Sequence, residues 1–294
     1  ELEIKILEAL HQKVIEISKD IIILSRKIAS LDVCSTLGFI AEMHNWCRPL
    51  IDNSKDFIIK DGRHSVVEKT IFKKSLNAFV PNDCSLSTNE HLWLITGPNM
   101  AGKSTFLRQN AHIIILAQIG SYVPAKQAKI GIASKLFSRI GASDNISKGQ
   151  STFMVEMLET SYIIKNADEK SFIILDEIGR GTSTFDGLAI AWAIIEKVLR
   201  SNKSRTLFAT HYHELTEIEK TNSKVKNVSC EIKEWNDEII YSYKVVEGKS
   251  KGSLGIKVAE LAGFPGDVIV EAKALLGKLQ SKGVEQEDFH LKEE

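Results

Sequence analysis

A glycine-rich loop between an apolar strand and a helix constrains this chain more than any other feature. The loop is Gly97-Pro98-Asn99-Met100-Ala101-Gly102-Lys103-Ser104, followed by Thr105. It fits the pattern G-x-x-x-x-G-K-[ST] and lies between the apolar run 92–95 and a helix-period segment over 104–119. Glycines let backbone N–H groups turn towards phosphates, and the helix start attracts negative charge. The sequence therefore predicts a nucleotide-phosphate site in which Lys103 supplies a mobile positive charge and the Ser104 hydroxyl reaches Mg²⁺.

The alternation of strands and helices continues along the chain and predicts the fold class. Apolar runs at 172–175 and 206–209 indicate further buried strands, and a helix-period segment covers 187–199. This order predicts an α/β fold with a parallel sheet and crossover connections. Other elements are expected as follows: short strands at 57–60, 66–67 and 78–83, an edge strand or hairpin arm at 238–246, helices at 256–262 and 268–279 with Gly263 as a stop, and a disordered polar tail at 281–294.

Two acids follow the strand at 172–175. Asp176 and Glu177 come at its carboxyl end, which is the edge where ligands sit in open α/β sheets. We therefore expect Asp176 to organise Mg²⁺ and Glu177 to orient or deprotonate an attacking water. The strand at 206–209 ends in Thr210 and His211, and His211 is a candidate sensor of the terminal phosphate.

A second glycine-containing loop leads into a helix. Residues 147–157 read Ser-Lys-Gly-Gln-Ser-Thr-Phe-Met-Val-Glu-Met. A hydroxyl at a helix start, here Ser151, can help to bind an anion or can simply cap the helix. One nucleotide does not need two such loops from one chain. If the loop binds phosphate, it faces the nucleotide of a partner subunit, and a dimer follows.

The first segment has a heptad pattern. Apolar residues recur at spacings of 3 and 4, at positions Leu7, Leu10, Val14, Ile17, Ile21, Leu24, Ile28 and Leu31. A helix of this length spans about 45 Å, too long to be buried along its whole length by one domain. We expect it to project, the alternative being an amphipathic helix packed on a compact fold.

Composition excludes several other classes of protein. The 38 basic residues balance the 38 acidic residues, so the chain has no overall positive charge to hold a nucleic acid. The most apolar long stretch, 109–125, is interrupted by polar residues, which argues against a membrane span. The four cysteines are scattered, as is usual in a reducing compartment. The chain begins at Glu1 rather than Met, and we expect it to be part of a longer protein.

Taken together, the motifs resemble those of the C-terminal ATPase domain of MutS-type mismatch-repair proteins, in the same order. The matching segments are 63–68, 97–105, 120–125, 151–157, 176–184 and 209–212. The resemblance implies a P-loop NTPase fold of the ABC ATPase type. It also implies four regions: the end of a lever helix and junction over 1–50, the ATPase domain over 51–250, a helix-turn-helix for dimerisation over 251–280, and the tail.

The resemblance also implies roles for individual residues. Asn99 would lie near the γ-phosphate, Phe79 would stack on adenine, and Tyr243 would pack on the other face of the base. Ser151 would act in trans on the partner's nucleotide, and His211 would be the switch. Three positions depart from the family pattern: Ser65 replaces Pro, Ala101 replaces Gly, and Leu254 replaces a Tyr of the dimer contact.

The implied activity is ATP hydrolysis with Mg²⁺ at two composite sites of a homodimer, controlling a clamp on mismatched DNA. A MutL-type partner and a bacterial cytoplasmic, nucleoid-associated location are implied as well. The mismatch-reading Phe-x-Glu motif is absent from the sequence, so that region is expected upstream of Glu1. Two alternatives stay open: a MutS paralogue that acts on recombination intermediates, and a nucleotide-gated dimerisation module with little turnover.

Overall fold

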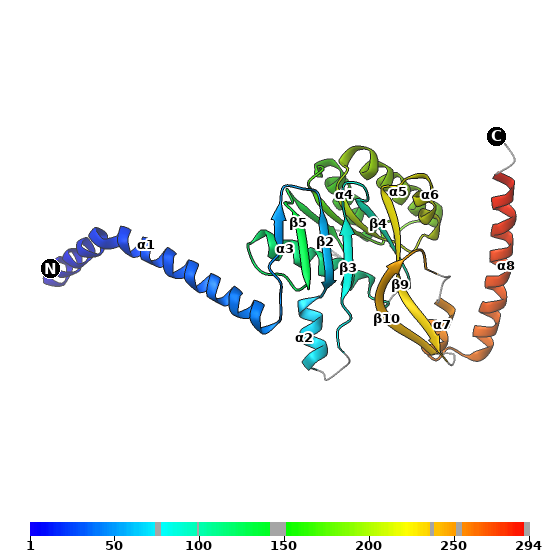
Figure 1. Ribbon diagram of the computed structural model, residues 1–294, viewed down its shortest axis with the longest axis horizontal. Helices are drawn as coiled ribbons and strands as arrows, with labels where there is room; N and C mark the ends of the chain where they lie inside the picture. Colours follow the sequence, from blue (N-terminus) through cyan, green and yellow to red (C-terminus); the bar gives the residue numbers. More distant parts are fainter. Residues whose placement is uncertain (74–77, 99, 142–150, 236–237, 251–254, 291–294) are drawn as a thin grey trace.

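The protein is built around a six-stranded sheet, whose strands β4, β9 and β10 are labelled in Figure 1. The computed structural model describes residues 1–294 except 74–77, 99, 142–150, 236–237, 251–254 and 291–294. The strand order is β10-β9-β4-β8-β7-β6. The strands are β4 (Leu92–Thr96), β6 (Leu136–Arg139), β7 (Phe172–Asp176), β8 (Arg205–Ala209), β9 (Val225–Trp235) and β10 (Glu238–Glu247).

The sheet confirms the predicted α/β class. Strands β9, β4, β8, β7 and β6 run parallel, and β10 pairs antiparallel with β9 at the edge. The crossover helices are α3 (Lys103–Gln118), α4 (Thr152–Asn166) and α5 (Thr184–Lys197), and a short α6 (Ile218–Thr221) precedes β9. Burial on both faces explains the apolar runs at 92–95 in β4, 172–175 in β7 and 207–209 in β8.

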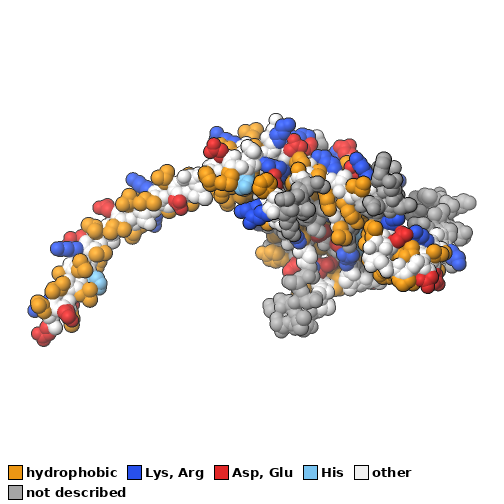
Figure 2. Space-filling model, turned by 90° about the horizontal axis from the view of Figure 1, so that it is seen from below, with side chains coloured by type: hydrophobic (Ala, Val, Ile, Leu, Met, Phe, Trp, Pro, Cys, Tyr) orange, Lys and Arg blue, Asp and Glu red, His pale blue; other side chains and the backbone are white. Residues whose placement is uncertain are grey.

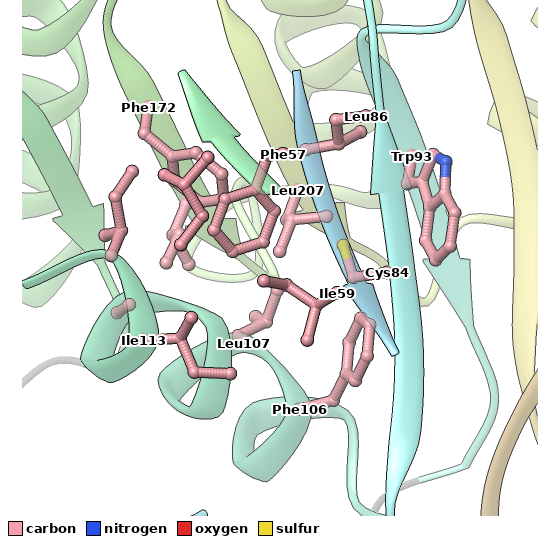
Figure 3. Close-up of a cluster of buried hydrophobic side chains, with 14 of the residues drawn as sticks. Phe57, Ile59, Cys84, Leu86, Trp93, Phe106, Leu107, Ile113, Phe172 and Leu207 are labelled. Atoms are coloured by element: carbon pink, nitrogen blue, oxygen red, sulfur yellow. The ribbon is translucent and has the colours of Figure 1, made fainter. Parts of the chain in front are cut away.

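Alternate side chains of the central strands enter two separate cores. In β4, Trp93 and Ile95 face α3, whereas Leu92 and Leu94 pack with residues of α4 and α5. Figure 3 shows the first core, in which Phe106, Leu107 and Ile113 of α3 contact Phe57 and Ile59. The sheet is therefore the middle layer of the domain, and each core buries one side of it.

A second, four-stranded sheet covers α3. Its order is β1-β5-β2-β3, formed by β1 (Leu50–Asp52), β2 (Phe57–Gly62), β3 (Asn82–Leu86) and β5 (Gln127–Gly131). The prediction of a strand at 66–67 is wrong, because this segment belongs to α2 (Ser65–Lys73). Val67 and Ile71 then lie one helical turn apart and line the same cavity, a spacing that the isolated Val66-Val67 pair did not reveal.

The N-terminal helix projects from the domain, as predicted. Helix α1 (Leu2–Met43) extends away from both sheets, and Ala41 is its one buried residue (Figure 1). The eight apolar residues of the heptad pattern are 50–71% exposed. Figure 2 shows hydrophobic side chains spread along the helix.

Two further helices end the chain. Helix α7 (Gly255–Leu261) is followed by a turn and by α8 (Gly266–His290). Gly263 adopts a left-handed φ of 84° and donates its N–H to the carbonyl of Glu260, which confirms it as the helix stop. Helix α8 continues to His290, into the polar segment from 281 that the sequence predicts as a tail. In the part of the chain that the structure describes, no helix combines the length and apolarity needed to cross a membrane.

Candidate nucleotide site

The predicted phosphate loop joins β4 to α3. Gly97 and Gly102 have φ angles of 128° and 99°, a region that disfavours side chains, and Gly102 is the N-cap of α3. Lys103, the first residue of α3, is buried, and its ammonium contacts the carbonyl of Gly97 and lies 3.6 Å from Glu177 Oε1. Ala101 is buried in the loop, while Asn99 lies outside the described residues. The loop therefore holds a cation at a helix N-terminus, as an anion site requires.

Asp176 lies at the end of β7, within reach of this loop. Its Oδ2 accepts a 2.7 Å hydrogen bond from Ser104 Oγ. Its Oδ1 is buried and has no hydrogen-bond partner among the described residues. Burial raises the pKa of Asp176, the bond from Ser104 opposes that rise, and the charge of Glu177 adds to it.

These two residues fit a magnesium ion. A buried carboxylate oxygen without a partner leaves room for a cation, and a hydroxyl beside it supplies a second oxygen. Among the described residues, no group of three or more His, Cys, Asp and Glu side chains could hold a metal. Mg²⁺ characteristically takes few protein ligands and completes its shell with water and phosphate oxygens.

Glu177 continues from β7 with a strained backbone. Its φ is 55°, and its N–H donates to the carbonyl of Ala209 at 2.9 Å. The carboxylate contacts the Arg180 guanidinium through Oε2 and faces Lys103 through Oε1. The candidate general base thus lies between two cations. We did not single out Arg180 from the sequence, although its position three residues after Glu177 places it in the same loop.

His211 follows β8, the strand between β4 and β7. Loss of solvent lowers its pKa, the positive charge of Arg180 lowers it further, and Glu177 opposes the change. The ring centroid lies 4.1 Å from that of Tyr212. A neutral imidazole at pH 7 can donate one hydrogen bond and accept another, which suits a residue that senses a phosphate.

The base-stacking candidates line the same cavity as the phosphate loop. This cavity of about 920 Å³ is bordered by Phe79, Tyr243, Lys103, Ser104 and Glu177, with Val67 and Ile71 from α2. Its size is typical of a small-molecule site. Phe79 lies in the segment before β3, and Tyr243 belongs to β10, so the two aromatic residues reach the cavity from parts of the chain far apart in sequence.

Asn82 holds the strand segment that presents Tyr243. The β9–β10 pairing shifts register between Tyr241 and Val245, and Tyr243 has a φ of 55°. Asn82 Nδ2 donates to the Tyr243 carbonyl at 2.9 Å, while its Oδ1 accepts from the Val245 N–H at 2.8 Å. These contacts join residues far apart in the chain, and no local signal in the sequence marked Asn82.

Ser151 is the N-cap of α4. Its hydroxyl accepts from the Met154 N–H at 3.2 Å, and the residue is exposed. Ser151 is not among the described residues that line the cavity, and the preceding 147–150 lie outside the described residues. Within one chain Ser151 therefore caps a helix, and its predicted role in trans stays a prediction. Leu254 of the expected dimer contact also lies outside the described residues.

The two sheets and their helices fit an α/β domain of the ATPase type. The family described as MutS domain V matches residues 93–280. Three relatives, each named DNA mismatch repair protein MutS, align with 95% of the chain: those of Ruegeria pomeroyi and Ehrlichia chaffeensis are 49% identical, and that of Rhodopseudomonas palustris is 50% identical. The chain belongs to the MutS family. It spans 31–34% of the length of these relatives.

Proposed function

We propose that this chain is the ATPase motor domain of a MutS-type DNA mismatch-repair protein. One observation carries the proposal: a single cavity is bordered by two aromatic side chains, the phosphate loop and a carboxylate. Beside it, the Ser104–Asp176 pair fits Mg²⁺. The reaction is hydrolysis of ATP by water to ADP and phosphate.

Each residue of the site has a proposed role that follows from its position. Phe79 and Tyr243 would hold the base, and the loop from Gly97 to Thr105, with Asn99, would hold the phosphates. Lys103 would balance their charge, and Mg²⁺ on Ser104 and Asp176 would add positive charge there. Glu177 would orient the attacking water and take its proton, and His211 would contact the terminal phosphate.

The assembly that we propose is a homodimer. Ser151 at the start of α4 would supply a hydroxyl to the partner's nucleotide, and α7 and α8 would add a second dimer contact. Projecting α1 would pass the state of the nucleotide site to a clamp that holds mismatched duplex DNA. A MutL-type repair protein as partner and a bacterial cytoplasmic, nucleoid-associated location complete the proposal. The names of the relatives support mismatch repair over a role with recombination intermediates.

Two substitutions test the ATPase. Glu177→Gln should keep binding of ATP and Mg²⁺ but lower kcat by roughly two to four decades, because an amide cannot take the proton. Lys103→Ala should weaken ATP binding itself, since Lys103 faces phosphates in the ground state too. Lys126→Ala is the control, because that lysine is 74% exposed and borders no part of the cavity among the described residues. Titration measures the Kd for ATP, and a phosphate-release assay measures kcat. An unchanged kcat in Glu177→Gln would show that Glu177 is not the general base.

One observation favours a second candidate, a nucleotide-gated dimerisation module. Both oxygens of Glu177 face cations, with Arg180 on Oε2 and Lys103 near Oε1. A water molecule could bind at Oε2 only after displacing the Arg180 contact. If the chain binds ATP and dimerises but releases no phosphate above the Glu177→Gln variant, this second function is the correct one.

A further inference from the structure

A buried carboxylate joins the helix that begins at Ser151 to the loop that carries Glu177. Glu156 lies in the second turn of α4 and is 9% exposed. Its Oε1 accepts a 2.7 Å hydrogen bond from the N–H of Gly179, two residues after Glu177. The bond spans two elements that the sequence places far apart, and the proposed roles above do not use it.

The charge of Glu156 is paired. Arg139 lies at the end of β6, is 5% exposed, and places its Nη2 atom 3.6 Å from Glu156 Oε2. The same guanidinium binds Glu159 at 3.0 Å through Nε. Arg139 and Glu156 are both buried, and a buried charge without a partner is strongly unfavourable. The ion pair therefore keeps the two side chains next to each other.

The peptide at Gly179 is held on its other side as well. The Tyr212 hydroxyl donates to the Gly179 carbonyl at 3.0 Å, and Tyr212 directly follows His211. Gly187 of α5 packs against both groups: a Cβ there would lie 2.2 Å from the Tyr212 oxygen and 2.3 Å from the Gly179 oxygen. Gly179 itself has a left-handed φ of 94°.

We propose that Glu156 is a positioning residue for Glu177. By binding the Gly179 N–H, it fixes the loop after β7 to the helix whose N-cap is Ser151. A movement of α4 on contact with a partner's nucleotide would then shift Glu177 of the same chain. This inference rests on the proposed function, because it assigns Glu177 and Ser151 the roles given there, and it adds a connection between the two sites of a dimer.

The test compares two neighbouring acids. Glu156→Ala removes the bond to Gly179 and one contact of Arg139, whereas the control Glu159→Ala removes only a contact of Arg139. Glu156→Ala should lower kcat about 10- to 100-fold with the Kd for ATP changed less than about twofold, because a displaced base slows chemistry without affecting ground-state binding. Glu156→Gln keeps an oxygen acceptor and should recover part of the loss. Tyr212→Phe removes the hydrogen bond to the Gly179 carbonyl, so it should lower kcat with little change in the Kd for ATP, as Glu156→Ala does.

Amide hydrogen exchange gives a readout that does not depend on turnover. Segment 177–181 of the nucleotide-free chain should exchange faster in Glu156→Ala than in Glu159→Ala, at matched melting temperatures. Equal exchange, or equal kcat, in these two variants would overturn the proposal. If the unaltered chain hydrolyses no ATP, the proposed function fails, while the exchange comparison still decides whether Glu156 holds the loop.

The proposed coupling between Ser151 and Glu177 through Glu156 is tested separately with a double variant. If Glu156 connects the two sites, the double variant Ser151→Ala/Glu156→Ala should lose less kcat than the product of the two single losses. In the control double variant Ser151→Ala/Glu159→Ala, the loss of kcat should equal the product of the two single losses. Simple multiplication in both pairs, or a Ser151→Ala variant of normal activity, would overturn the connection.

Discussion

Removal of the Phe79 ring should weaken ATP binding without destabilising the fold. Phe79 is half-buried, borders the cavity proposed to bind ATP and is absent from both buried cores. Stacking of a base on an aromatic ring contributes about 1–3 kcal/mol, so Phe79→Ala should raise the Kd for ATP about 5- to 150-fold. A core phenylalanine would instead cost about 3–5 kcal/mol of folding stability.

Isothermal titration with two ligands isolates the base. Tripolyphosphate carries the phosphates of ATP without adenine, so its Kd should be the same for Phe79→Ala and the unaltered chain. Phe72→Ala is the matched control, because Phe72 lies on α2, is 84% exposed and does not border the cavity. The reasoning is refuted if the melting temperature falls by more than about 5 °C with an unchanged Kd, or if tripolyphosphate binding weakens equally.

Three further outcomes are expected. Gly187→Ala should lower the melting temperature and segment 177–181 protection, since its Cβ would meet two oxygens, whereas Gly38→Ala in exposed α1 should be neutral or stabilising. Burial lowers the pKa of His64 to about 4, so between pH 4 and 6.5 the unfolded chain binds more protons than the folded chain. The free energy of unfolding should therefore fall as the pH drops from 6.5 to 4. Thermal melts of His64→Asn should show a weaker dependence on pH over the same range. Mixing Ser151→Ala chains with Lys103→Ala chains should restore up to about a quarter of the unaltered activity through one intact site per heterodimer; confirmed heterodimers without recovery would count against action in trans.

Local sequence determined the elements with a strong, self-contained pattern. Buried strands of a parallel sheet contact other layers on both faces, so β4 and β7 are largely apolar and β8 ends in the apolar run 207–209; all three strands were predicted correctly. The glycines of the loop at 97–104 also carried a local signal, because the left-handed backbone at Gly97 and Gly102 favours glycine. Helix α2 was missed because two adjacent valines indicate a strand when their contacts are unknown.

The tertiary structure decided which side chains work together. Asn82 reaches the Tyr243 segment and Glu156 reaches Gly179 through contacts that no spacing rule encodes. Hydrogen bonds of this kind form only when strands and helices distant in the chain are packed, and their energy depends on burial that a sequence does not display. The residue types thus predict the chemistry of the candidate site, while the contacts that position its residues arise from the packing of the two sheets and α4.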